Sequence, residues 1–429
     1  MKRREFLSHT AGLASVLAAS VSTAQTRPCP PELEGQPVNC PDDEPPLDGP
    51  PTWFLNAADE QWFAVPVTNT GQSIGMTSGM FSNFTGAGFD QGRLEFVKTA
   101  AGGHVIDWRN GTYVLQLNRE SPAWVLLVED SLLADRTEGS GGKQGNIGNQ
   151  SYRDGTPRAV HNWNSGCFPV GNTIWLPAMT GQYTFGAFGS QVWGLNRAAL
   201  TNPPVAAANA PWRHYGHGIP EAYGGLGGGQ HLLEAASSAY DYDTGLIWTH
   251  SQFSQSGAYP FWSIDTARGS INQHPSFGGQ FPGAGATTRR GSSFIVDGYW
   301  ILVCPIGGRT LVLDLSNPTS GGIKEIKADG SPSYNSLETA GVGYHAASRT
   351  AYFYRPSLGK TLVTLRVPSD PWNGTYAWGS ETPGGATPSG LSGNYSHFVI
   401  INDMGNGQPA LFHGGGRTGR PYMYKLPMT

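Results

Sequence analysis

Residues that could bind an anion or exchange a proton recur a few positions ahead of short apolar segments in this 429-residue chain. Arg side chains can hold a carboxylate or sulfate through two parallel hydrogen bonds, and Glu, His or Tyr can act as a general acid or base. Because only 14% of the residues are charged, this recurrence predicts one shared site. The predicted acid–base residues are His161, His397 and Tyr395, and the predicted ligand-binding residues are Arg158, Glu234, Arg289, Arg290 and Glu338. Location on solvated loops, or pairing in Arg–Glu bridges, is the alternative explanation for these residues.

The apolar segments themselves predict a repeated unit of four β-strands. Hydrophobic second strands are expected at residues 112–117, 173–177, 246–250, 299–304, 351–354 and 409–413. Third strands are expected at residues 124–128, 192–195, 261–264, 310–313, 361–365 and 422–426. Turn-forming pairs such as Asn110-Gly111 and Asp297-Gly298 precede the second strands. Six such units, starting near Arg93, predict an all-β, six-bladed β-propeller. Its innermost strands are expected to start around a central funnel, which is the expected ligand site.

Closure of the ring is expected to involve the first strand-like segment of the mature chain. The sixth unit reaches Thr429 soon after its third strand, and residues 61–68 could supply its missing outer strand. Such closure removes the strand edges that an open ring would expose. Residues 52–429 are therefore expected to form a single propeller domain. The alternatives are seven blades, if residues 54–89 contain another blade, and a β-sandwich with a second domain.

The composition is typical of a protein built from turns and aromatic-rich strands. The chain has 60 Gly, 32 Pro and 11% aromatic residues, and 38% hydrophobic residues are enough for a sizeable core. A formal net charge of -4 and the lack of a basic stripe exclude nucleic acid as the leading partner. No segment approaches 18 uninterrupted apolar residues, so stable membrane insertion is not expected. We expect a monomer.

The first residues combine paired arginines with a short, mildly apolar run. Lys2-Arg-Arg-Glu-Phe-Leu7 is followed by the apolar residues 11–21 and by the small residues 22–24. This order resembles the twin-arginine translocation signal. The resemblance implies removal of residues 1–24 and export of the folded protein by the twin-arginine translocase, to the periplasm or outside the cell.

The cysteines suit an oxidising compartment. Residues 25–51 are expected to form a Pro-rich arm, in which Cys29 and Cys40 are expected to form a local disulfide. Cys167 and Cys304 lie in apolar, strand-like surroundings and are expected to be buried free thiols.

Two segments resemble the kelch pattern, in which a hydrophobic strand ends in a glycine pair. They are Cys304-Pro-Ile-Gly-Gly-Arg-Thr-Leu-Val-Leu-Asp-Leu315 and Leu411-Phe-His-Gly-Gly-Gly-Arg-Thr-Gly-Arg420. In the spacing of the strands, the resemblance covers most of residues 90–429. It implies a kelch-like propeller. Tyr344-His345 also looks like the Tyr-His copper ligands of galactose-oxidase-type radical enzymes. Tyr344 and His345 are therefore added to the candidate ligand-binding residues.

Two further patterns could bind metal ions. His214-x-x-His217, with His231 nearby, has suitable donors, but the adjoining segment is a glycine-rich loop that imposes no common face. Asp241-x-Asp243-x-Gly245 loosely suggests calcium, although turn formation explains the pattern without an ion. No cofactor is expected to be required, and copper or calcium are the alternatives.

Aromatic-rich segments favour a carbohydrate ligand. Residues 210–215 and 371–376 mix Trp and Tyr with hydrogen-bonding groups, and flat rings beside polar donors suit stacking on a sugar ring. We therefore expect an exported protein that binds an acidic polysaccharide at the funnel and that could cleave it as a lyase or hydrolase. A non-catalytic recognition or scaffold propeller and a copper radical oxidase of galactose-oxidase type are the alternatives.

Overall fold

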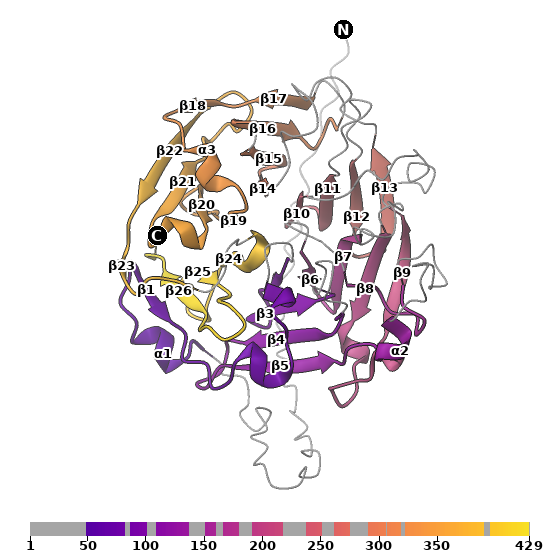
Figure 1. Cartoon of the computed structure of the whole chain (residues 1–429). Coiled ribbons are helices and arrows are strands. Elements are labelled where there is room, and N and C mark those ends of the chain that lie inside the picture. The colour runs from indigo at the N-terminus through magenta and orange to yellow at the C-terminus, as the bar shows by residue number, and fades with distance from the viewer. Residues whose placement is uncertain are drawn as a thin grey trace, which may run out of the picture. The chain divides into compact units, whose positions relative to one another are not determined.

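Six small sheets, arranged as blades around a ring, contain the strands of this protein (Figure 1). The computed structural model describes residues 49–81, 86–100, 109–136, 151–159, 166–179, 191–217, 237–250, 261–274, 291–305, 307–318, 322–389 and 395–428. Residues 46–429 group into one unit, which holds all of these described residues. The prediction of an all-β, six-bladed propeller is confirmed.

Four strands, from the innermost to the outermost, make up each of the first four blades. Blade 1 contains β2 (Gly88–Asp90), β3 (Glu95–Thr99), β4 (Thr112–Gln116) and β5 (Ala123–Val128). Blade 2 contains β6 (Phe168–Val170), β7 (Thr173–Met179), β8 (Gln191–Asn196) and β9 (Trp212–His217). Blade 3 contains β10 (Ser237–Asp241), β11 (Leu246–His250), β12 (Phe261–Asp265) and β13 (Ser270–His274). Blade 4 contains β14 (Ser292–Val296), β15 (Tyr299–Cys304), β16 (Arg309–Asp314) and β17 (Ile323–Glu325).

The last two blades each gain a fifth, parallel strand at the outer edge. Blade 5 contains β19 (Gly341–His345), β20 (Thr350–Tyr354), β21 (Leu362–Arg366), β22 (Thr375–Glu381) and β18 (Lys327–Asp329). Blade 6 contains β24 (Phe398–Ile401), β25 (Ala410–His413), β26 (Tyr422–Lys425), β1 (Gln61–Ala64) and β23 (Gly384–Gly385). The helices in the described part are short: α1 (Thr52–Leu55), α2 (Leu133–Arg136), α3 (Tyr334–Leu337) and several single 3₁₀ turns, among them η3 (Gly79–Phe81) and η9 (Tyr395–His397). None of the helices in these residues is long and apolar enough to cross a membrane.

Strand β1 completes blade 6 from far away in the sequence. It pairs antiparallel with β26, where Trp62 lies opposite Tyr424. Trp62 is almost fully buried, and its indole Nε1 donates a 3.2 Å hydrogen bond to the backbone oxygen of Lys360. Beside the strand, Lys425 forms an ion pair with Asp59 at 3.1 Å. The prediction that a strand within residues 61–68 closes the ring is confirmed.

The prediction for the first blade was wrong by one strand. The segment at residues 112–117, expected to be a second strand, contains the third strand β4, and the segment at 124–128 belongs to the fourth strand β5. The ring therefore begins at β2, before Arg93. Strand β3 was missed because Glu95 and Lys98 interrupt its apolar residues, although both side chains are buried.

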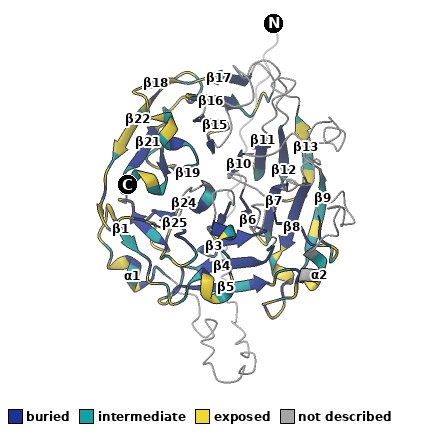
Figure 2. Cartoon of the chain, viewed as in Figure 1, coloured by how far each residue is buried: buried dark blue, intermediate teal, exposed yellow. Residues whose placement is uncertain are grey.

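Hydrophobic side chains are buried between neighbouring blades, as the dark strands of Figure 2 show. Each pair of neighbours, including blade 6 with blade 1, shares one buried cluster. Representative pairs around the ring are Phe96 and Phe412, Val114 and Trp193, Trp175 and Ile264, Trp248 and Trp300, Ile301 and Phe353, and Tyr354 and Phe398. Because burial accounts for most of the favourable free energy of folding, this arrangement favours a complete ring.

The two faces of the ring differ in their connections. At one face, which we call the hairpin face, short turns join the innermost strand to the second strand in blades 1 to 5, and the longer segment 402–409 makes this connection in blade 6. Asp297 and Gly298 both have positive φ, as a two-residue hairpin requires. Asp241 caps its turn by accepting hydrogen bonds from the backbone N–H of Asp243 at 3.1 Å and the hydroxyl of Thr244 at 2.6 Å. The opposite face, which we call the loop face, carries the starts of the innermost strands and the connections between blades.

Candidate functional site

The starts of the innermost strands meet one another at the loop face. The backbone N–H of Ala87, just before β2, donates a 2.7 Å hydrogen bond to the hydroxyl of Ser396, just before β24. The hydroxyl of Ser292, at the start of β14, donates a 2.5 Å hydrogen bond to the backbone oxygen of Ala340, just before β19. Residues that precede different innermost strands are therefore brought together at this face.

Glycines allow this close approach between blades 1 and 2. A Cβ atom on Gly86 would overlap the backbone of Gly166, and one on Gly88 would overlap the carbonyl group of Cys167. Backbone thus fills the space at this point, as glycine permits. Side chains for chemistry must then come from the residues ahead of the innermost strands or from the second strands.

Lys98 supplies such a side chain from the second strand of blade 1. It is fully buried in β3, and its Nζ donates a 3.0 Å hydrogen bond to the backbone oxygen of Gly86. The same Nζ lies 2.7 Å from Nε2 of His397. It also lies 5.7 Å from the centre of the Phe81 ring, a distance at which a cation is attracted to the ring face. The sequence did not reveal this residue as a candidate.

His397 meets Lys98 from blade 6. It is the last residue of η9, immediately before β24, and it is fully buried. Its ring lies beside those of Phe81 and Phe96, with centroid distances of 6.4 and 6.2 Å. Its backbone oxygen accepts a 2.9 Å hydrogen bond from the N–H of Gly414. The predicted acid–base residue therefore lies in the buried seam between blades 6 and 1.

Burial changes the acid–base properties of this pair. It lowers the pKa of Lys98 to about 7, an effect that the neighbouring Cys167 partly opposes. Burial also raises the pKa of the Cys167 thiol to about 12, an effect that Lys98 partly opposes. The thiol therefore stays protonated at neutral pH, whereas Lys98 exists in both its charged and neutral forms. A lysine of this kind can give or take a proton under physiological conditions.

A second buried histidine lies on the other side of blade 6. His413, the last residue of β25, accepts a 3.3 Å hydrogen bond at Nδ1 from the N–H of Gly415, and its Nε2 is buried without a hydrogen-bond partner. Its ring centre lies 5.4 Å from that of Tyr354 in blade 5. Burial lowers the pKa of His413 to about 3. The histidine is therefore neutral at physiological pH.

The remaining predicted site residues have different outcomes. His161, Glu234, Arg289 and Arg290 lie outside the described residues, as do Cys29 and Cys40 of the predicted disulfide. Tyr395 belongs to η9, next to the pair, but only its backbone is described. Glu338 lies ahead of β19 at the loop face and is partly exposed.

Arg158 lies ahead of β6, as predicted, but in a buried position. Its Nε donates a 3.0 Å hydrogen bond to the backbone oxygen of Ser151, and its guanidinium group lies 5.8 Å from the centre of the Tyr152 ring. Asn110 of blade 1 anchors the same segment through a 2.9 Å hydrogen bond to the backbone oxygen of Pro157. These contacts give Arg158 a role in holding the segment.

Tyr344 and His345 do not join the loop-face residues. They occupy the other end of β19, at the hairpin face, where Nδ1 of His345 lies 2.8 Å from the hydroxyl of Ser348. The ring of Tyr344 stacks on Phe294 with centroids 5.0 Å apart. Tyr344 therefore contacts blade 4, whereas His345 contacts the β19–β20 turn of its own blade.

The described parts of the predicted metal patterns and aromatic segments make contacts within the propeller, whereas His231 lies outside the described residues. No group of three potential metal-ligating side chains occurs within the described ranges. Residues 212–215 belong to β9, where the centre of the Tyr215 ring lies 4.5 Å from that of Trp175. The ring of Trp372 stacks on that of Tyr299 with centroids 6.1 Å apart. Its centre lies 4.1 Å from Nζ of Lys324. Cys167 and Cys304 are buried free thiols, as expected.

No family model matches the chain, and no curated protein matches it. Solved structures share only a loose likeness. YjhT is 10% identical, with 80% of this chain and 94% of that chain covered and a TM-score of 0.41. The hydrazine synthase of Kuenenia stuttgartiensis is 9% identical over 80% of this chain and 84% of that chain, with a TM-score of 0.39. The RS223 β-xylosidase is 9% identical over 62% of this chain and 92% of that chain, with a TM-score of 0.33. This level of similarity assigns neither a family nor an activity.

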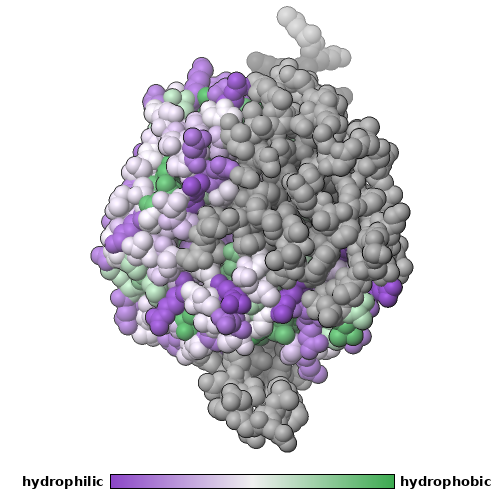
Figure 3. All heavy atoms as spheres, in the orientation of Figure 1, coloured by the Kyte–Doolittle hydropathy of each residue, from purple (hydrophilic) through white to green (hydrophobic). Residues whose placement is uncertain are grey.

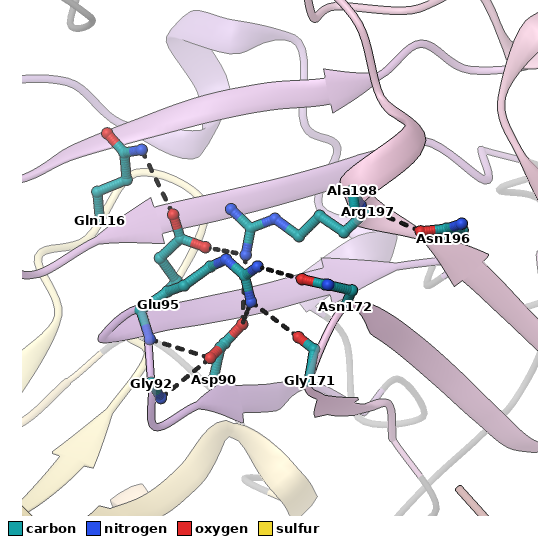
Figure 4. A network of polar contacts seen from close by, with 10 residues as sticks. Asp90, Gly92, Glu95, Gln116, Gly171, Asn172, Asn196, Arg197 and Ala198 are labelled. Atoms are coloured by element: carbon teal, nitrogen blue, oxygen red, sulfur yellow. Dashed lines mark hydrogen bonds and ion pairs between the residues drawn. The ribbon is translucent and has the colours of Figure 1, made fainter. Parts of the chain in front are cut away.

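A second polar cluster links blade 1 to blade 2 at the hairpin face (Figure 4). Arg197 forms ion pairs with Glu95 and with Asp90, the latter at 3.4 Å. Arg93 forms an ion pair with Asp90 at 3.1 Å and donates a 2.8 Å hydrogen bond to the backbone oxygen of Gly171 in blade 2. Two guanidinium groups thus neutralise the charge of two buried carboxylates and link blade 1 to blade 2.

The described surface in the view of Figure 3 is mainly hydrophilic, with small and separate hydrophobic areas. The large hydrophobic residues exposed within the described ranges are Leu55, Leu132, Tyr242 and Met428. Leu55 belongs to α1 and Tyr242 to the first turn of blade 3, so these two lie in different parts of the ring.

Proposed function

We propose that the loop face binds an anionic glycan and that His397, in contact with Lys98, exchanges a proton with it. The observation that carries this proposal is the pairing of two basic side chains where innermost strands of two blades begin. An anion bound nearby would favour the charged form of Lys98, because opposite charge stabilises a buried ammonium group. Binding is then coupled to proton uptake near neutral pH.

The arginines ahead of β14 support the same proposal from the sequence. Arg289 and Arg290 precede Ser292 in the sequence, and the hydroxyl of Ser292 contacts the start of the next blade. Guanidinium groups suit the carboxylates or sulfates of an acidic polysaccharide. We assign these two arginines to ligand binding and His397 to proton exchange.

A glycan-array screen of the mature protein, followed by calorimetry on each hit, tests this proposal. We expect proton uptake on binding between pH 7 and 8, measured in buffers of different ionisation enthalpy. Arg289→Ala should weaken binding by about 1 to 3 kcal/mol, the range for a lost charge-assisted contact, without a large change in melting temperature. Arg268→Ala, which removes an exposed side chain at the hairpin face, is the matched control. Absence of any acidic glycan among the hits would contradict the proposal.

Recognition without cleavage is a second candidate function. The observation that favours it is the complete burial of Lys98 and His397, because a catalytic residue must reach the reacting atoms. Product analysis after long incubation with a bound glycan separates the two functions. New reducing ends or unsaturated products would establish cleavage, and their absence with intact binding would establish recognition alone.

We also propose that residues 1–24 direct export through the twin-arginine pathway. The support is the order Arg-Arg-Glu-Phe-Leu ahead of a short apolar run. Replacing both Arg3 and Arg4 by Lys should retain the precursor in the cytoplasm, because the two cations differ in the geometry of the hydrogen bonds they donate. Unchanged recovery from the periplasm or medium would refute this route.

A further inference from the structure

We infer that the hairpin face carries a sugar-binding surface of its own, between blades 4 and 5, and that it binds an uncharged sugar unit. Tyr299 and Trp372 form its aromatic part, and Asp314, Lys324 and Asn373 form its polar part. We call these five residues the rim site. The inference does not depend on the proposed function, whose ligand is acidic and whose site lies at the loop face.

The strand register of blade 4 brings three of these side chains to one side of the sheet. Tyr299, the first residue of β15, lies opposite Asp314, the last residue of β16. Lys324 of β17 lies opposite Val312, two residues before Asp314. Alternate residues of a strand point to the same side, and Val312 is buried in the cluster that blade 4 shares with blade 5. All three side chains therefore lie on the side that faces blade 5.

Blade 5 adds Trp372 and Asn373 from the connection between β21 and β22. The carboxylate of Asp370 accepts hydrogen bonds from the backbone N–H groups of both residues, each at 3.0 Å, and so fixes this turn. The Trp372 ring is tilted by 24° from that of Tyr299, with centroids 6.1 Å apart, which is an offset stacking geometry. Nζ of Lys324, 4.1 Å from the centre of the Trp372 ring, donates a 3.4 Å hydrogen bond to Oδ1 of Asn373.

The side chains of the rim site reach the solvent. Asn373 is exposed, and Tyr299, Trp372, Asp314 and Lys324 are partly exposed. Packing alone would favour complete burial of both rings, because each buried aromatic side chain adds to stability. Partly exposed rings beside polar groups instead suit a sugar, whose apolar face packs on the rings while its hydroxyls form hydrogen bonds.

The charges around Tyr299 favour an uncharged ligand. Burial raises the pKa of its hydroxyl, and the carboxylates of Asp314, Asp370 and Asp297 raise it further. The charged groups that shift this pKa are all negative, so a carboxylate or sulfate on the ligand would be repelled there. Among the described residues, the hydrogen bonds that Asp314 accepts come from Ser316 and end at Oδ1. Oδ2 of Asp314 can therefore accept a hydrogen bond from a sugar hydroxyl.

Affinity electrophoresis of the mature protein tests the rim site, in gels that contain soluble dextran, galactan, galactomannan or arabinoxylan. We expect at least one of these uncharged polysaccharides to retard the wild type. Tyr299→Ala should bind it about tenfold more weakly, because the sugar loses a stacking contact. Asp314→Asn should also weaken binding, since it replaces a charged acceptor by a neutral one. Tyr242→Ala removes an exposed ring of blade 3 at the same face and, as the matched control, should bind like the wild type.

Hydroxyl-radical footprinting of the wild type with the retained polysaccharide locates the contact without any variant. We expect protection of Tyr299 and Trp372 and no change at Tyr242. If Tyr299→Ala does not fold, Asp314→Asn and the footprint still decide the question. The inference would be overturned by retardation with none of the four polysaccharides, by equal affinity of Tyr299→Ala and the wild type, or by a footprint that leaves Tyr299 and Trp372 unprotected.

Discussion

Blade 1 has a polar cluster on each of its two sides, and the clusters differ in charge balance. Towards blade 2, at the hairpin face, Arg93 and Arg197 compensate Asp90 and Glu95. Towards blade 6, at the loop face, Lys98 contacts another base, His397. The first cluster neutralises its own charges, whereas the second brings two proton-binding groups together.

This difference separates stability from chemistry within one blade. In the first cluster each buried carboxylate faces a guanidinium group, so the cluster can hold two blades together. A buried base whose pKa is near 7 changes its protonation under physiological conditions, which costs stability and permits proton exchange. Truncation and substitution on either side of blade 1 test this division.

The largest effect should follow removal of the strand that completes blade 6. A protein starting at Asn69 lacks β1 and the buried side chains of Phe54, Trp62 and Val65, whereas one starting at Thr52 keeps them. At about 1.5 to 3 kcal/mol for each buried side chain, the shorter protein should lose about 5 kcal/mol or more of unfolding free energy. Thermal and urea denaturation measure this loss. Equal unfolding free energies for the two proteins would show that β1 does not stabilise blade 6.

Arg197→Ala should have the next largest effect. It leaves the carboxylates of Asp90 and Glu95 buried with less compensation, so the unfolding free energy should fall by about 3 kcal/mol, near the lower end for a broken buried pair. Arg268→Ala removes an exposed partner of Asp265 and should change stability by less than about 1 kcal/mol. Glycan binding should be the same in both variants. A loss of binding in Arg197→Ala alone would mean that the two clusters are not separate in function.

Lys98→Met should change how stability depends on pH. The folded pKa of Lys98, about 7, lies below its usual value of 10.5, so between these values the unfolded chain binds more protons. The wild type should therefore gain about 1.4 kcal/mol per pH unit relative to Lys98→Met as pH rises from 7 to 9. Urea denaturation at several pH values measures the difference. Parallel stability curves for the two proteins would be inconsistent with a titrating Lys98.

His413→Asn should have a smaller effect, limited to acid. Because burial lowers the pKa of His413 to about 3 from 6.5, the wild type should lose stability as pH falls below 6.5, by about 2 kcal/mol at pH 5. The variant keeps an acceptor for Gly415 but cannot titrate, so it should lack this loss. Denaturation at pH 7 and pH 5 gives both values. An equal loss in wild type and variant would assign the acid sensitivity to other groups.

Most of the ring could be predicted from the sequence because its strands alternate in hydrophobicity and follow clear turn residues. The second strands of blades 2 to 6 were identified, and so was closure by β1. The strands of blade 1 were assigned one position too late because β3 buries Glu95 and Lys98. Charged residues such as these are expected at the surface when only the sequence is known. Their burial depends on Arg197 and His397, which are distant in sequence.

The candidate site was predicted only in part for the same reason. The position of His397 ahead of an innermost strand could be inferred from the repeat, whereas Lys98 gave no signal of its own. The clue was available in its alternation with Phe96: on a correctly aligned β3 these two residues share one side of the strand. Arg158 was expected to bind ligand, and the structure shows it buried, with a hydrogen bond to the backbone of Ser151.

The pairing of β1 with β26 has a consequence for how the protein is made. A ribosome produces Trp62 long before Tyr424, its neighbour in the finished sheet. At about 5 to 20 residues per second, β1 waits on the order of tens of seconds for its partner strand. During synthesis the growing chain therefore contains several blades but no closed ring, and the edge of β1 is open to pairing with other chains. Blade 6 can be completed only after β26 has left the ribosome, which makes ring closure a late step in biogenesis.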